Sequence, residues 1–141
     1  MSSFMHHVTS ELYLNEKFIT ISYINGHAYG GGAELTTATD MRIANKHAKV
    51  AWVHKKMALQ PGWGGAARLT RLVGGQTALY MLTTAKVFNT DELIGLGYCA
   101  PEIVGDIDIW LDKHIMSTPK EVIRAIKKNN VNAIKETPIN I

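Results

Sequence analysis

Three consecutive glycines followed by a glutamate carry the strongest chemical signal in the sequence. Gly30, Gly31 and Gly32 follow a β-type run and open the segment that leads to Glu34. Because glycine has no Cβ, a ligand oxygen can approach the main chain closely, and unpaired N–H groups at a helix start carry partial positive charge. Such N–H groups beside a carboxylate would polarise a carbonyl and move a proton next to it.

Hydrophobic patterning around the glycines predicts the elements that position them. Residues 18–24 alternate apolar and small polar side chains, which predicts a strand that leads into the glycine turn. Apolar residues at helical spacing, together with Gly and Pro stop signals, predict the remaining elements. We expect helices over 4–14, 33–39, 66–73, 77–84, 92–96 and from 106 onward with a break near 117–119, and short strands over 41–44, 49–53 and 101–104.

Composition describes a globular protein with a slight excess of positive charge. The chain has 141 residues, 46% of them hydrophobic and 19% charged, with a net charge of +3. These values fit one domain with a core, which the predicted helices and strands make an α/β domain, and they argue against a disordered or fibrous chain. The basic side chains of the middle segment suit a phosphorylated ligand better than a nucleic-acid groove: Lys46, Lys49, Lys55, Lys56, Arg68 and Arg71.

Several classes of site and location are disfavoured by what the sequence lacks. The single cysteine, Cys99, excludes an internal disulfide, fits a reducing compartment and predicts a buried small apolar residue. No apolar run is long enough for a membrane helix, and Glu11 and Glu16 argue against a transit peptide, so we expect a cytosolic protein. No His, Cys and carboxylate cluster has metal-ligand spacing, so we expect no metal. Residues 62–67 match a dinucleotide fingerprint only formally, because they follow a proline rather than a strand.

At this point the residues resemble a known family. The run 24–40, followed by Pro61-Gly62-Trp63-Gly64-Gly65 and Arg68-Leu69, resembles the crotonase (enoyl-CoA hydratase/isomerase) superfamily, whose members act on acyl-CoA thioesters. The resemblance implies a partial ClpP/crotonase-like ββα spiral core over 1–118 and the start of a C-terminal helical region over 119–141. It also implies that coenzyme A is part of the substrate, and that no separate cofactor is needed.

Four segments are similar to the ethylmalonyl-CoA decarboxylase branch of this superfamily: 34–38, 53–57, 61–65 and 119–125. That likeness implies a carbon–carbon lyase that decarboxylates a malonyl-type thioester, such as ethylmalonyl-CoA or methylmalonyl-CoA. Loss of CO₂ leaves an enolate whose oxygen the main-chain N–H groups can stabilise. A hydratase or isomerase of the same superfamily is the alternative enzyme.

The resemblance also assigns roles to individual residues. Gly31 would supply one N–H group of the oxyanion hole, and Glu34 would be an acid/base residue. The second glutamate of the hydratases lies twenty residues after Glu34 and seven before Pro61, where this sequence has His54. Hydration is therefore disfavoured, and Glu34 or His54 could donate the proton that decarboxylation needs, unless His54 is a surface or packing residue. The residues expected to line the substrate are Ala28, Tyr29, Gly30, Gly32 and Trp63.

The sequence also departs from the family at its two ends. Members of the superfamily carry upstream strands and a loop that donates the second oxyanion N–H group, and residues 1–17 do not resemble that loop. The helices that build the family's trimers and hexamers are expected to be mostly missing after Thr137. We therefore expect an unpaired sheet edge around 18–24, and a non-catalytic truncated crotonase that associates with full-length subunits is a further alternative.

Overall fold

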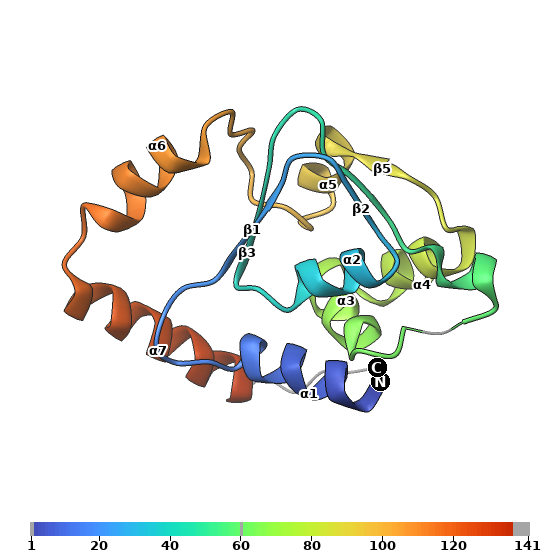
Figure 1. Cartoon of the computed structure of the whole chain (residues 1–141), viewed down its shortest axis with the longest axis horizontal. Coiled ribbons are helices and arrows are strands. Elements are labelled where there is room, and N and C mark those ends of the chain that lie inside the picture. The colour runs from blue at the N-terminus through green and yellow to red at the C-terminus, as the bar shows by residue number, and fades with distance from the viewer. Residues whose placement is uncertain (1, 60, 137–141) are drawn as a thin grey trace.

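Helices and short strands alternate along the computed structural model, which describes residues 2–59 and 61–136 (Figure 1). The α-helices are α1 (Ser2–Tyr13), α2 (Gly31–Thr37), α3 (Gly65–Val73), α4 (Gly75–Thr84), α5 (Thr90–Gly95), α6 (Ile107–Leu111) and α7 (Lys120–Glu136). The strands are β1 (Ile21–Ile24), β2 (His27–Tyr29), β3 (Met41–Ala44), β4 (Lys49–Ala51) and β5 (Phe88–Asn89). A 3₁₀ segment, η1 (Val53–Met57), and a π-helical segment, η2 (Asp112–Met116), complete the described chain.

The strands form two small sheets. In one, β1 pairs in parallel with β3, with Ile21 opposite Met41 and Ile24 opposite Ala44. In the other, β4 lies between β2, which is parallel to it, and β5, which is antiparallel. Among the described residues no strand pairs with the second edge of β1, as the sequence led us to expect. Helix α2 follows β2 directly and packs against both β2 and α3, which places the glycine turn where sheet and helices meet.

The hydrophobic core lies between the sheets and helices α2 to α5. Large, fully buried apolar side chains come from strands, from helices and from the segments that follow them, so these parts of the chain share one core: Ile43, Val50, Trp52, Leu69, Met81, Leu93 and Tyr98. Cys99 is buried at the edge of this core, as predicted. Burying these side chains removes apolar surface from water and supplies the main force that holds α2 against the sheet.

Several predicted elements are confirmed, and others are shorter or differently placed. The predicted strand 18–24 begins only at Ile21, because the Asn15 carboxamide accepts hydrogen bonds from the N–H groups of Lys17 and Phe18 and holds a turn there. The predicted strand 49–53 ends at Ala51, where η1 begins after Trp52. The strand predicted over 101–104 is wrong: only Ile103 makes a bridge, to Ala44. Pro101 has no N–H group to contribute to a ladder.

Three elements were not predicted, because they are very short or lie inside a segment that was assigned to another element. Strand β2 lies inside the glycine motif, strand β5 has two residues, and η1 contains His54. Two of them lie at the candidate site, since β2 leads into the glycine turn and η1, which follows β4, carries His54. The sequence pattern predicts a turn around β2 and the end of a strand where η1 begins.

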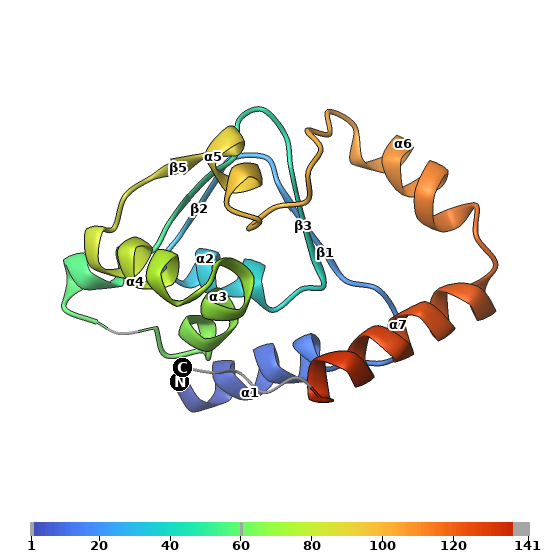
Figure 2. The same ribbon diagram turned by 180° about the vertical axis from the view of Figure 1, so that it is seen from behind.

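Helices α6 and α7, joined by η2, extend away from the rest of the molecule in both views (Figures 1 and 2). The C-terminal part of α7 returns to lie beside α1, and there Lys127 and Val131 are buried. The Lys127 ammonium pairs with the Asp40 carboxylate, which also accepts a hydrogen bond from the N–H group of Thr20 at 2.8 Å. Asp40 therefore braces the turn between α2 and β3. None of the helices in the described residues has both the length and the apolar character needed to cross a membrane.

Candidate active site

The glycine turn has the conformation that its sequence predicts. Gly30 precedes α2 with φ 58° and ψ −118°, a backbone conformation that a residue with a side chain rarely adopts. Its N–H group donates to the carbonyl of Ala51 at 3.1 Å, which ties the turn to β4. Gly31 is the first residue of α2, and its N–H group has no hydrogen-bond acceptor among the described residues. This N–H group is therefore free to bind an oxygen from outside.

The indole of Trp63 lies against Gly31. A Cβ atom placed on Gly31 would come within 2.7 Å of the Trp63 ring, whereas one placed on Gly32 would meet nothing within 4 Å. Of these two glycines, only Gly31 is thus required by close packing. Trp63 was predicted to line the substrate, and the structure brings its ring to the glycine that was predicted to polarise the thioester.

Glu34 and His54 form a buried pair. The His54 Nε2 and Glu34 Oε1 atoms lie 2.7 Å apart, and the two side chains are only 10% and 2% exposed. Helix α2 presents Glu34 toward the core side, and η1 carries His54 to it from the far end of β4. His54 is therefore not a surface residue, and the two residues predicted to handle protons are in direct contact.

The second carboxylate oxygen of Glu34 accepts two main-chain hydrogen bonds. The N–H group of Trp63 donates to Oε2 at 2.8 Å, and that of Gly65 donates at 3.3 Å. Gly65 must lack a side chain, because a Cβ there would lie 2.7 Å from Glu34 Cγ. With His54 on the other oxygen, both oxygens of this buried carboxylate are hydrogen-bonded, as burial of a charged group requires.

Arg68, on α3, lies next to the residues that hold Glu34. It is buried, and burial lowers the pKa of its guanidinium while the nearby Glu34 charge acts to raise it. Its Nη2 donates to the carbonyl of Trp63 at 2.6 Å, and its Nε donates to Thr37 Oγ1 at 3.1 Å. Arg68 thus contacts both the loop and the helix that hold Glu34.

The other residues predicted to bind substrate surround the glycine turn at different depths. Ala28 is half-buried on β2, opposite Val50. Tyr29 is exposed at the end of β2, and its ring stacks on that of His27 with centroids 5.1 Å apart. Gly30, Gly32 and Trp63 complete the predicted lining, and their roles in binding stay predictions. The structure brings together Gly31, Glu34, His54 and Trp63, whereas the Tyr29 ring is exposed and contacts His27.

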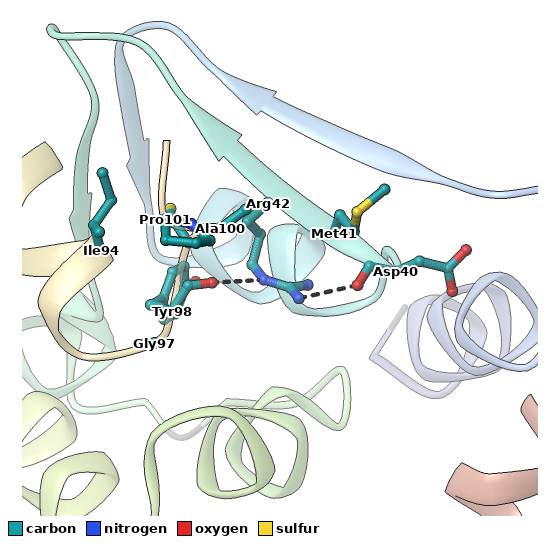
Figure 3. A pocket seen from close by; sticks show the side chains of 9 residues that line it. Asp40, Met41, Arg42, Ile94, Gly97, Tyr98, Ala100 and Pro101 are labelled. Carbon is teal, nitrogen blue, oxygen red and sulfur yellow. Dashed lines mark hydrogen bonds between the residues drawn. The ribbon is translucent and has the colours of Figure 1, made fainter. Parts of the chain in front are cut away.

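A separate pocket of about 390 Å³ lies behind β3 and contains none of these residues (Figure 3). Arg42 projects across it, and its guanidinium donates to main-chain carbonyls of Thr36, Thr39, Asp40 and Tyr98. Burial lowers the pKa of Arg42. These bonds join the end of α2 to the segment after α5, so the arginine of this pocket has a structural role.

The residues that support Glu34 from behind are not predicted from the sequence. Thr37 and Gly65 lie in segments that carry the family resemblance but that assign them no role, and Thr9 occupies an ordinary helix position. The sequence groups Arg68 with the basic side chains that suit a phosphorylated ligand and with the family motif, and its place between the apolar residues Ala67 and Leu69 was the available signal of burial. Among the described residues no group of three or more His, Cys, Asp and Glu side chains could hold a metal ion.

The chain matches a known protein family. The family model described as Enoyl-CoA hydratase/isomerase matches residues 4–140. The chain is 37% identical over 147 aligned residues to a Gallus gallus protein named ethylmalonyl-CoA decarboxylase, covering 99% of this chain and 48% of that protein.

Solved structures show the same fold. An enoyl-CoA hydratase from Bacillus anthracis superposes with a TM-score of 0.84 at 28% identity, over 96% of this chain and 54% of that one. A Thermobifida fusca protein in complex with acetoacetyl-CoA superposes with a TM-score of 0.81 at 24% identity, over 93% of this chain and 52% of that one. The chain spans about half the length of these relatives. It belongs to the enoyl-CoA hydratase/isomerase family, the crotonase superfamily, and its fold is part of the crotonase fold.

Proposed function

We propose that the chain contributes to a carbon–carbon lyase that decarboxylates a malonyl-type acyl-CoA thioester, such as ethylmalonyl-CoA or methylmalonyl-CoA. The observation that carries the proposal is the direct contact between Glu34 and His54 beside the free N–H group of Gly31. The likeness to proteins named ethylmalonyl-CoA decarboxylase supports the same choice. Coenzyme A enters as part of the substrate.

The reaction needs an oxyanion site and a proton. The thioester oxygen would lie against the N–H group of Gly31. The bond between the α-carbon and the carboxylate breaks, CO₂ leaves, and the electron pair passes into the thioester as an enolate whose oxygen this N–H group stabilises. The hydrogen-bonded pair of Glu34 and His54 then supplies a proton to the α-carbon, which gives the saturated acyl-CoA.

Hydration of a double bond asks for a different arrangement. A hydratase of this family uses a carboxylate pair that shares the attacking water. In this chain His54 Nε2 touches Glu34 Oε1 at 2.7 Å, which leaves no space for a water between them. The other oxygen of Glu34 is hydrogen-bonded to two main-chain N–H groups. Both observations support decarboxylation over hydration.

Hydration or isomerisation of an enoyl-CoA stays the second candidate, because the B. anthracis structure that the chain resembles is a hydratase. Replacing the imidazole by a carboxylate distinguishes the two. If His54 is what excludes hydration, H54E gains the ability to hydrate crotonyl-CoA and loses CO₂ release. If the native chain already hydrates crotonyl-CoA, the second candidate is the better one.

The experiment compares products from three substrates. The purified chain is incubated separately with ethylmalonyl-CoA, methylmalonyl-CoA and crotonyl-CoA, and CO₂ and acyl-CoA products are quantified by mass spectrometry. We expect CO₂ with butyryl-CoA or propionyl-CoA from the first two and no hydrated product from the third. Efficient hydration without CO₂ release would overturn the proposal. No turnover, combined with stable association with a full-length relative, would favour a non-catalytic subunit.

The location and the assembly of the enzyme are two further proposals. We propose a cytosolic location, which the single buried thiol of Cys99 suits, and a homotrimeric or hexameric assembly of the kind typical of the family. No membrane or nucleic-acid partner is part of the proposal. Fractionation of cells and light scattering of the purified protein test these two points directly.

A further inference from the structure

Arg68 lies behind the candidate active site and is hydrogen-bonded to two different segments that hold Glu34. It is 5% exposed and projects from α3 toward the loop that precedes this helix. Gly64 leaves room for it, since a Cβ there would come within 2.8 Å of Arg68 Nη1. Gly64 also has φ 79°, so the loop is shaped by a residue without a side chain at the point where the guanidinium passes.

One connection from Arg68 reaches the Glu34 side chain through the main chain of Trp63, whose carbonyl and N–H group lie on either side of its Cα atom. Arg68 Nη2 donates to the Trp63 carbonyl at 2.6 Å, and the Trp63 N–H group donates to Glu34 Oε2 at 2.8 Å. The hydroxyl of Thr9, on α1, also lies 2.8 Å from the Trp63 carbonyl. That hydroxyl has one proton and also lies near two carbonyls of its own helix, so Arg68 is the definite donor.

A second connection from Arg68 reaches the Glu34 main chain. Arg68 Nε donates to Thr37 Oγ1 at 3.1 Å, and Thr37 Oγ1 donates to the Glu34 carbonyl at 2.6 Å. Thr37 is 2% exposed, so this connection is shielded from water. The guanidinium therefore contacts both a partner of the Glu34 carboxylate and a partner of its backbone.

We propose that Arg68 is a positioning residue that fixes the direction of the Glu34 carboxylate toward His54 and of the Trp63 loop over Gly31. The consequence for catalysis rests on the proposed function, whereas the positioning itself does not. Arginine suits this task because its planar fork offers separate donors in fixed directions, and a lysine ammonium cannot reach both acceptors with the same geometry. The ring of Trp63 also contacts Gly31. Arg68 therefore supports both the proposed oxyanion site at Gly31 and the proposed proton donor at Glu34.

Amide hydrogen exchange measured by NMR tests the positioning role without any substrate. The amides of Trp63 and Gly65 report the hydrogen bonds to Glu34, and the amide of Met81 in the core of α4 serves as the internal reference. In R68M we expect exchange at Trp63 and Gly65 to be about tenfold to a hundredfold faster, with Met81 unchanged. R68K should fall between R68M and the native chain. R124M, at an exposed arginine of α7, is the matched control and should change neither site amide.

A second variant keeps the test decisive if R68M does not fold. T37V removes one hydroxyl at nearly constant volume, and we expect exchange at Trp63 to rise severalfold. Unchanged protection of Trp63 and Gly65 in both R68K and T37V would overturn the proposal. An equal rise at Met81 would also overturn it, because Arg68 would then support the whole fold rather than the site.

Turnover adds a separate readout. With ethylmalonyl-CoA as substrate, R68K should lower kcat about tenfold while leaving KM nearly unchanged, since a misplaced acid affects the transition state more than binding. If the native chain releases no CO₂, the proposed function fails, and the exchange data still decide the role of Arg68. If R68K releases CO₂ at the native rate, the positioning role in catalysis is wrong.

Discussion

The surroundings of Glu34 and the extended arm formed by α6, η2 and α7 are built in opposite ways. Around Glu34, residues from α2, η1 and the loop before α3 meet through short hydrogen bonds, and Gly31 and Gly65 allow contacts that no side chain would permit. The arm leaves large apolar side chains in water: Ile109, Met116, Val122 and Ile126. It is anchored to the rest of the described chain mainly near Lys127 and Val131.

This difference shows where the chain is specified by tertiary contacts and where by local sequence. The site depends on buried polar groups that must all find partners, so small changes there have large effects. The arm depends on helix-forming sequence and on few buried contacts, so most of its positions should tolerate change. The exception is its single buried cation, whose loss should matter more than any other change in the arm.

The largest expected effect comes from that exception. In D40N the Lys127 ammonium, 1% exposed, keeps its burial and loses its counter-charge, and we expect a loss of about 3–5 kcal/mol in the free energy of unfolding, measured by urea titration. The double variant D40N with K127M should recover most of this loss, because no unpaired charge is left. A loss below about 1 kcal/mol in D40N would mean that the arm is not anchored there.

Stability at alkaline pH tests the hydrophobic core next to the site rather than the arm, because the core contains the buried side chains of Tyr98 and Cys99. Burial raises the pKa of the Cys99 thiol from 9.0 to about 11 and that of the Tyr98 hydroxyl from 10.0 to about 12. The unfolded chain loses these protons first, so stability is complete below pH 9 and falls as pH rises, by up to about 3 kcal/mol for Cys99 alone. Urea titrations from pH 8 to pH 11 measure the fall. C99A should lack the part of this fall that begins near pH 9. A pH profile in C99A identical to the native one would contradict the assignment of that part to the Cys99 thiol.

Gly65 tests how tightly the site is packed. In G65A the new methyl group would lie 2.7 Å from Glu34 Cγ and 2.9 Å from the Trp52 ring, so we expect a loss of about 1–3 kcal/mol in unfolding free energy. G75A is the matched control, since nothing lies within 4 Å of a Cβ there. Its stability should stay within about 0.5 kcal/mol of the native value. Equal stability of the two variants would show that the site region relaxes as easily as a surface.

The smallest expected effect belongs to the exposed side of the arm. Ile109 is 66% exposed, and I109A should change the unfolding free energy by no more than about 0.5 kcal/mol. I43A provides the contrast within the same residue type, because Ile43 is 1% exposed and its truncation should cost about 2–5 kcal/mol. Thermal unfolding followed by circular dichroism measures both. A large loss in I109A would show that the arm packs against a partner in solution.

The fold was predictable wherever local pattern and chain conformation agree. The spacing of apolar residues predicted α1, α3 and α4, and the glycine run predicted the turn before α2. The strand expected over 101–104 failed because pairing depends on a partner strand and on N–H groups that Pro101 lacks. Strand β2 was missed because three residues carry too little pattern to separate a strand from a turn.

The sequence predicted which residues belong to the candidate site better than it predicted the contacts between them. The position of His54 relative to Glu34 followed from the family resemblance, but their direct contact depends on where η1 begins. Arg68, Thr37 and Gly65 were missed because a sequence does not say which buried arginine or threonine lies behind which carboxylate. These contacts join residues about thirty positions apart in the sequence, and only the packed helices bring them together.

The pair of Asp40 and Lys127 also has a meaning for the order of folding. These residues are 87 positions apart, and one carboxylate oxygen of Asp40 serves both Lys127 and the N–H group that precedes β1. Closing so long a loop costs entropy, so this contact should form after the β1–α2–β3 unit has already assembled. Removing the ion pair would then accelerate unfolding and leave the refolding rate nearly unchanged. The pair therefore contributes to the kinetic stability of the native chain, because it slows unfolding.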